Sequence, residues 1–201
     1  MCSTFTRRGK RYESGATLFA GLGPGQLFET WRQRFDLPIE FDCPSTPIEL
    51  RSPTLRLPIG PDRNALVDRL CALPGAPHAA LRRFFTLQGR VADLLWPIFD
   101  DPERLPPISP AGLRWHLGRL HRYPRLLSIL GKPLSTVLRH HRLDHWQPLT
   151  QMLDAFCQIT IQSRAADAEA IFALAALDYC FRGTGHIRGG IGVLATSLTD
   201  A

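Results

Sequence analysis

The stretch Ser14-Gly15-Ala16-Thr17-Leu18-Phe19-Ala20-Gly21-Leu22-Gly23-Pro24-Gly25 decides the expected fold of this chain. It follows a short strand-like run at residues 10–13 and precedes an amphipathic segment that predicts a helix over 26–35. Glycine is favoured where the backbone takes a positive φ or approaches a ligand closely. The composition leaves two interpretations open: a plain loop between strand and helix, or a loop that passes beside a ligand.

Length and composition favour a globular protein that buries a core. The chain has 201 residues, of which 44% are hydrophobic, enough for one domain or one and a half. Its five cysteines are widely spaced without a Cys-x-x-Cys pair, which argues against a zinc knuckle or disulfide scaffold and suits a reducing compartment. No apolar run is long enough for a membrane-spanning helix, and the basic run at residues 6–11 lacks a signal-peptide pattern. We therefore expect a cytoplasmic protein.

The positive charge is concentrated in one segment. The whole chain has a net charge of +6, and the segment Ser109–Trp146 contains seven Lys or Arg and one acid, Asp144, which is also +6 (seven minus one). Such a segment faces nucleic acid, an anionic membrane or simply water. No nucleic-acid docking motif accompanies it, so nucleic acid is the weakest of the three and is not expected as a partner.

The hydrophobic periodicity predicts an α+β fold: a small antiparallel or mixed sheet with a larger helical layer. The strands are expected in a single sheet from residues 10–13, 48–50, 55–57 and 184–188. Helices are expected over 26–35, 62–73, 77–95, from Ser109–Pro110 to the break at Pro124, after Pro133, from about 146, over 165–179, and after Gly192.

Three other patterns suggest chemistry, and each also has a simpler structural explanation. Gly190-x-Gly192 formally matches part of a dinucleotide fingerprint, but the βαβ context is missing, so a tight strand-to-helix turn is preferred. The cluster His140, His141 and His145 lies among arginines that would repel a cation, so we expect no metal site. Asp178, near the end of an apolar helix, needs a partner, for which Arg182 is near. No catalytic residue is predicted.

Two stretches carry a family resemblance. Gly15-Ala16-Thr17-x-x-Ala20-Gly21-Leu22, and the run from Ala175 through Gly185-His186-Ile187-x-Gly189-Gly190-Ile191-Gly192, resemble segments of FAD-dependent carotenoid desaturases and isomerases, the phytoene-desaturase-like flavin oxidoreductases. The resemblance covers essentially the whole chain but only the middle of a longer family member.

The resemblance implies the substrate domain of a two-domain FAD flavoprotein. Residues 1–25 would be a remnant of the FAD domain, 26–183 the substrate domain, and 184–201 the return toward the FAD domain. Gly15, Ala16, Thr17, Gly189 and Gly190 would contact FAD. The family's dinucleotide-binding unit precedes the position of Cys2 and does not occur in this sequence. We therefore expect this chain to hold FAD weakly or not at all, and to be inactive alone.

The resemblance also implies a carotenoid substrate, and the position of the positive charge predicts contact with a membrane surface. The apolar helices over 146–160 and 165–179 would line the substrate channel, with Phe156, Ile159 and Leu174 as contacts, although ordinary core packing explains those residues as well. Peripheral association with an anionic membrane is expected through Arg114, Trp115, Arg119 and Arg122, because basic amphipathic helices with Trp bind such surfaces. The alternative function is a non-catalytic membrane- or lipid-binding module.

Overall fold

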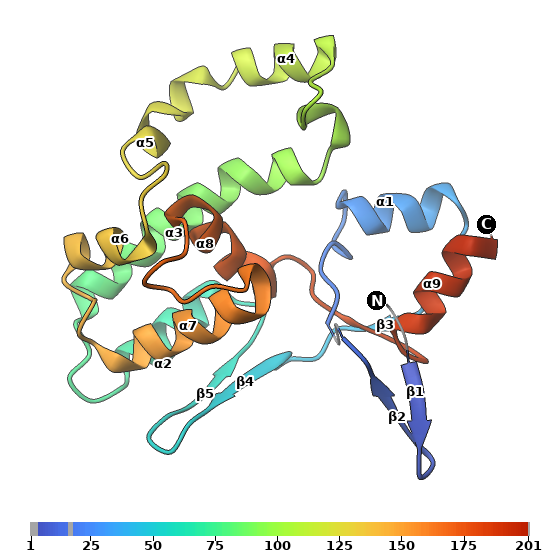
Figure 1. Ribbon diagram of the computed structural model, residues 1–201, viewed down its shortest axis with the longest axis horizontal. Helices are drawn as coiled ribbons and strands as arrows, with labels where there is room; N and C mark the ends of the chain where they lie inside the picture. The colour runs from blue at the N-terminus through green and yellow to red at the C-terminus, as the bar shows by residue number, and fades with distance from the viewer. Residues whose placement is uncertain (1–3, 16–17, 201) are drawn as a thin grey trace. The chain divides into compact units, whose positions relative to one another are not determined.

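The computed structural model describes residues 4–15 and 18–200 (Figure 1). Its architecture is α+β, mostly helical with small antiparallel sheets, which confirms the expected class. The chain forms two compact units: one holds residues up to Glu49, Pro58–Asp62 and the residues from Cys180 onward, and the other holds Leu50–Leu57 and Arg63–Tyr179. The division expected from the resemblance, after residues 25 and 183, stays a prediction.

The described helices follow the predicted order with changed ends. They are α1 Leu27–Arg34, α2 Arg63–Cys71, α3 His78–Phe99, α4 Pro110–Leu117, α5 Pro124–Leu127, α6 Leu134–His141, α7 Gln147–Ile161, α8 Ala170–Ala176 and α9 Ile191–Asp200, with the 3₁₀ turns η1 Pro102–Arg104, η2 Leu120–Arg122 and η3 Leu177–Phe181. The strands are β1 Thr4–Arg7, β2 Lys10–Glu13, β3 Phe41–Asp42, β4 Ile48–Arg51, β5 Arg56–Ile59 and β6 His186–Ile187.

The single predicted sheet is wrong. The strands form three separate two-stranded sheets, β1–β2, β3–β6 and β4–β5. The segment 10–13 pairs locally with β1 because Arg8 and Gly9, with φ of 51° and 74°, form a tight hairpin turn. The segment predicted as a strand over 184–188 contributes only two residues, which pair with β3. Strands of only two to four residues leave little edge for a larger sheet.

The helix predicted over 165–179 is also too long. Regular α-helix covers only α8, because the Glu169 carboxylate caps its start by accepting a hydrogen bond from the backbone N–H of Phe172 (3.0 Å). The other oxygen of Glu169 accepts from the N–H of Gly131 (2.9 Å). A side chain that caps a helix start fixes the residue before it outside the helix. After Ala176 the chain tightens into η3.

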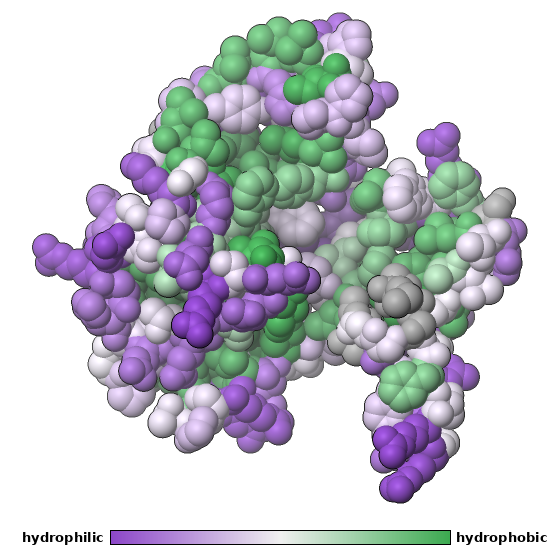
Figure 2. Space-filling view, viewed as in Figure 1, coloured by the Kyte–Doolittle hydropathy of each residue, from purple (hydrophilic) through white to green (hydrophobic). Residues whose placement is uncertain are grey.

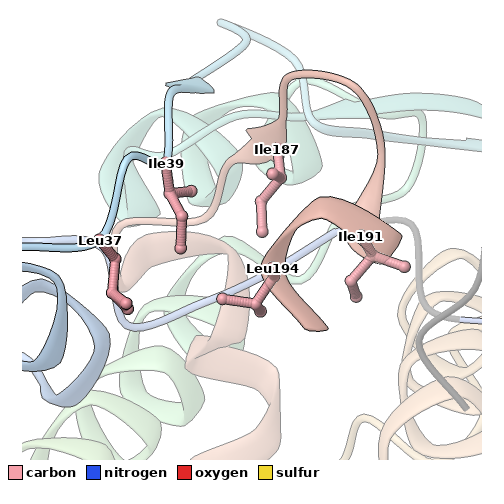
Figure 3. Packing of buried hydrophobic residues seen from close by; sticks show 5 residues of the cluster. All are labelled: Leu37, Ile39, Ile187, Ile191 and Leu194. Carbon is pink, nitrogen blue, oxygen red and sulfur yellow. The ribbon is translucent and has the colours of Figure 1, made fainter. Parts of the chain in front are cut away.

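Each unit has its own apolar core. In the first unit, β6 and α9 pack against the segment after α1, and Phe19 lies on this cluster (Figure 3). The buried cluster consists of Leu37, Ile39, Ile187, Ile191 and Leu194. In the second unit, α3 is the central helix and packs against α2, α6 and α8. Its fully buried residues Leu81, Phe84, Gln88 and Val91 recur at helical spacing.

Candidate functional site

The two stretches that carry the resemblance lie side by side in the first unit. Phe19 and Gly185 exchange both backbone hydrogen bonds as an isolated antiparallel bridge, with N···O distances of 2.9 and 2.8 Å. The N–H groups of Gly21 and Leu22 donate to the carbonyls of Arg182 and Gly183, each at 3.3 Å. Backbone pairing therefore brings together two segments that are more than 150 residues apart in the chain.

Of the residues expected to contact FAD, Gly15, Gly189 and Gly190 can be placed, and Ala16 and Thr17 lie outside the described residues. Gly15 is exposed. Gly189 and Gly190 have φ of 86° and 94° and form the turn from β6 into α9. A Cβ on Gly190 would come 2.7 Å from Oε1 of Glu13 and would also collide with the Thr4 side chain. This turn therefore needs glycine for both its conformation and its close packing.

The start of α9 already holds an anionic group of the chain itself. The N–H of Ile191 donates to both carboxylate oxygens of Glu13, at 3.1 and 3.2 Å, and the N–H of Gly192 donates to Oγ1 of Thr4 at 3.1 Å. Thr4 in turn donates to Glu13 (3.0 Å). Helix N-termini bind anions, and here a carboxylate takes that place. The geometry agrees with the predicted strand-to-helix turn and opposes a phosphate at this point.

The residues expected to contact substrate lie in two different environments. Phe156 and Leu174 are core residues, 5% and 0% exposed, whereas Ile159 is 71% exposed. None of the three lines the apolar pocket that the neighbouring residues form, and their role in substrate binding stays a prediction. That pocket has a volume of about 230 Å³ and is lined by Trp96, Phe99, Thr160, Ile161, Phe172, Ala175, Ala176 and Tyr179.

The apolar pocket is built on three helices of the second unit: α3, α7 and α8. The indole Nε1 of Trp96 donates to the carbonyl of Ala175 (3.1 Å), which fixes the ring between α3 and α8. Trp96 and Phe99 meet edge to face with ring centroids 6.2 Å apart. Phe172 is 54% exposed at the pocket and leaves it accessible from solvent. Aromatic walls around a small apolar space suit a rigid hydrophobic ligand.

Trp115, expected at a membrane surface, packs within its own segment. The guanidinium carbons of Arg104 and Arg119 lie 4.5 and 3.9 Å from the centroid of its rings, which are cation–π distances. The neighbouring His116 hydrogen-bonds to Tyr123 (2.6 Å) and to the carbonyl of Arg104 (2.9 Å). Burial raises the pKa of Tyr123, against a smaller lowering effect of Arg119. Trp115 therefore holds this segment together and is only partly accessible.

Leucines are the exposed apolar residues of this segment instead. The five are each 53–64% exposed: Leu113, Leu117, Leu120, Leu127 and Leu130. We call them the leucine face; Figure 2 shows hydrophobic side chains gathered along the α4–α5 segment. Arg114 and Arg122 are exposed in the same segment. The helix predicted from Ser109–Pro110 to the break at Pro124 is divided into α4 and η2, and α5 begins at Pro124 itself. Ser109 caps α4 as predicted by accepting from the N–H of Gly112 (3.0 Å). Across the described residues, no helix combines the length and hydropathy needed to cross a bilayer.

Asp178 and His141 have structural partners. Asp178 is paired with Arg63, a partner that the sequence did not suggest. His141 lies against the rings of Phe84 and His140, at centroid distances of 6.0 and 5.3 Å. Within residues 4–15 and 18–200, no group of three or more His, Cys, Asp or Glu side chains could hold a metal ion.

Comparison with family models, curated proteins and solved structures gave no match. The carotenoid-oxidoreductase resemblance therefore rests on the quoted stretches alone.

Proposed function

We propose that this chain is the substrate-binding portion of an FAD-dependent oxidoreductase that desaturates or isomerises carotenoids. The observation that carries the proposal is the apolar pocket on α3, α7 and α8, since α7 and α8 lie in the two segments that the resemblance assigns to the substrate. A carotenoid is a long, rigid polyene whose binding is driven by the burial of apolar surface. A volume of about 230 Å³ suits one end of such a molecule.

The cofactor part of the proposal is limited to the flavin ring. Gly15, Ala16, Thr17, Gly189 and Gly190 are its proposed contacts, supported by the hydrogen bonds between the two stretches that contain them. The described residues do not fit the pyrophosphate of FAD at α9, because the Glu13 carboxylate occupies the helix start and would repel it. The redox chemistry would be that of the cofactor, and this chain would position the polyene.

Carotenoid binding can be measured through tryptophan fluorescence. A polyene that absorbs at the emission wavelength of tryptophan quenches this fluorescence at short range. The full chain is titrated with such a carotenoid in detergent, and saturable quenching is expected. Ala176→Leu, which fills the pocket, should raise the dissociation constant about ten-fold, equivalent to about 1.4 kcal/mol. Trp96→Phe should reduce the quenched amplitude, because Trp96 lines the pocket.

Leu198→Ser is the matched control, because Leu198 is 39% exposed on α9 and outside the pocket. It should leave the affinity unchanged. An affinity unaffected by Ala176→Leu would contradict the proposed pocket. Ile159→Ser separately tests whether this exposed residue contacts the polyene.

A peripheral membrane-binding function is the second candidate, and the leucine face favours it. Exposed leucines beside Arg114 and Arg122 match the composition of helices that lie in the interface of anionic bilayers. This function is compatible with the first, because carotenoids dissolve in bilayers. It also stands alone as a non-catalytic lipid-binding module if the polyene does not bind.

A further inference from the structure

A second pocket in the helical unit is lined by basic side chains. It has a volume of about 690 Å³ and lies between α3, α6 and the segment that follows α5. Its lining residues include Arg82, Arg83, Arg90, Lys132, His140 and His141. Among the residues that the structure describes, no Asp or Glu lines it. It shares no residue with the apolar pocket or with the leucine face.

Most of the charge in this pocket is uncompensated. Arg82 pairs with Asp68 at 3.0 Å, an exposed ion pair. The side chains of Arg83, Arg90 and Lys132 have no carboxylate partner in the part of the chain that the structure describes. Folding brings these three positive charges to one pocket from α3 and from the segment before α6. Like charges gathered in this way repel one another, and a bound anion would relieve the repulsion.

The two histidines add donors to the same wall. Burial lowers the pKa of His141, and the nearby charges of His140 and Arg83 lower it further. An anion beside the His141 imidazole would act in the opposite direction and favour its protonated, hydrogen-bond-donating form. The pocket thus offers guanidinium, ammonium and imidazole groups to one ligand.

Three apolar residues and the hydroxyl residues Thr86, Ser128 and Thr136 complete the lining of the pocket. Leu87, Ile129 and Val137 lie in its wall, and Val137 is 3% exposed. A small inorganic anion would use only the basic groups, so the lining suits a ligand with an anionic head and an apolar part. Three unpaired cationic groups carry more positive charge than a single carboxylate would neutralise. Guanidinium groups also match phosphate oxygens in geometry, so a phosphate suits the pocket better than a carboxylate.

We propose that this pocket binds the phosphate monoester group of an amphipathic ligand. Arg83, Arg90 and Lys132 hold the phosphate dianion, and Leu87, Ile129 and Val137 contact the adjoining carbon chain. The same chemistry occurs in soluble phosphate monoesters and in the headgroup of phosphatidic acid. The site is independent of the carotenoid proposal, because it uses different residues.

The experiment measures binding to the full-length chain by calorimetry and by vesicle flotation. The soluble probes are inorganic phosphate and glycerol 3-phosphate, with chloride at equal ionic strength as the reference. The vesicle probes contain phosphatidic acid, or phosphatidylglycerol at equal surface charge. The test variant is Arg83→Gln with Arg90→Gln. The matched control is Arg142→Gln with Arg164→Gln, which removes the same charge from exposed arginines outside the pocket.

The test variant should weaken binding of a phosphate monoester at least about ten-fold, because two charge-assisted contacts are lost. The control variant should change this binding by less than about two-fold. Saturable binding of glycerol 3-phosphate identifies a soluble ligand, and pocket-dependent binding to phosphatidic acid alone identifies a lipid. Equal losses in both variants, or no dependence on Arg83 and Arg90 with any probe, would overturn the site. Without ligand, the test variant should melt at a higher temperature than the wild type, since it removes repulsion; a lower melting temperature counts against the proposed repulsion.

Discussion

Arg63 and Asp178 form a buried ion pair between residues that are 115 positions apart in the chain. Arg63 donates from Nη2 and from Nε (3.2 Å) to one carboxylate oxygen of Asp178, and Nε2 of Gln88 donates to the same oxygen at 3.0 Å. The Asp178 side chain is fully buried, whereas Arg63 is 28% exposed. A Cβ on Gly89 would come 2.7 Å from the guanidinium, so glycine there makes room for it. The pair ties α2 to η3, the turn that follows α8, with Gln88 of α3 bonded to the same oxygen.

Removing one partner of this pair should destabilise the second unit strongly. Asp178→Ala leaves the guanidinium without its partner and leaves Gln88 short of an acceptor, and Arg63→Met leaves a buried carboxylate charge. Each should lower the free energy of unfolding by about 3–5 kcal/mol. The measurement is urea denaturation followed by circular dichroism.

The exposed pair Arg82–Asp68 provides the matched control for this prediction. Its side chains are 62% and 64% exposed, so Asp68→Ala should cost less than about 1 kcal/mol. Similar losses for Asp68→Ala and Asp178→Ala would mean that burial does not set the strength of the Arg63–Asp178 pair.

His141 should make folding stability depend on pH. Its pKa in the folded protein is lower than the ordinary 6.5 because of burial and the nearby charges of His140 and Arg83, with Arg82, Arg90 and Lys132 in the same pocket. The unfolded chain therefore binds the proton first as the pH falls. The contribution to stability is complete above pH 6.5 and is lost as the pH falls from there through the folded-state pKa.

The measurement is the urea midpoint between pH 8 and pH 5. His141→Gln should flatten the decline, whereas His121→Gln, which changes an exposed histidine outside the pocket, serves as the control and should leave the decline in place. A decline that is equally steep in both variants would assign it to other groups.

The cysteines should differ in reactivity. Burial raises the pKa of Cys157 to about 11 from 9.0, and Asp154 adds a smaller effect. The thiolate is the reactive form, and two pKa units mean roughly a hundred-fold less of it at pH 8. Cys43 is exposed and should react first with Ellman's reagent. Cys43→Ser, in a Cys2→Ser background, should remove the fast phase, whereas Cys157→Ala should not change it.

The leucine face should mediate binding to anionic membranes. The chain is expected to co-sediment with vesicles of anionic but not of neutral lipid. This binding should weaken at high salt. Leu117→Ser with Leu127→Ser should reduce partitioning about ten-fold, since two half-exposed leucines lose their contact with the bilayer. Arg114→Glu with Arg122→Glu should weaken it strongly, because the net charge of the Ser109–Trp146 segment falls from +6 to +2 (six minus four).

Two variants serve as controls for the membrane prediction. Trp115→Phe should have a small effect, because Arg104 and Arg119 already lie against the ring, and Leu198→Ser should have none. Equal binding to anionic and neutral vesicles, or binding to neither, would exclude this surface as a membrane contact.

Helix positions were the most predictable feature of this protein. Capping residues, prolines and apolar spacing act within one or two turns, so the starts of α4 at Ser109–Pro110 and of α6 after Pro133 could be read from the residues themselves. The α+β class followed from the same local signals. The prediction of one helix over 165–179 was wrong because Glu169 caps the start of α8. The same carboxylate is also held by its second hydrogen bond, from the N–H of Gly131.

The candidate sites depended on contacts between distant residues. The sequence singled out Asp178 but not Arg63 as its partner, since their meeting requires the packing of α2, α3 and α8. It likewise singled out Gly190 and Gly192, while the carboxylate of Glu13 at the start of α9 was visible only in the folded chain. The basic pocket drew its charges from α3 and from residues near α6, so a count of charge along the chain located only part of it.

By itself, the sequence determined the local elements and the concentration of positive charge between Ser109 and Trp146, because both are properties of neighbouring residues. Only the tertiary structure decided which of these side chains are covered. Trp115 is stacked against two arginines while five leucines of the same segment are exposed, the reverse of what helical spacing alone suggests. The physical reason is that exposure depends on what packs against a helix, and periodicity states only which residues share a face.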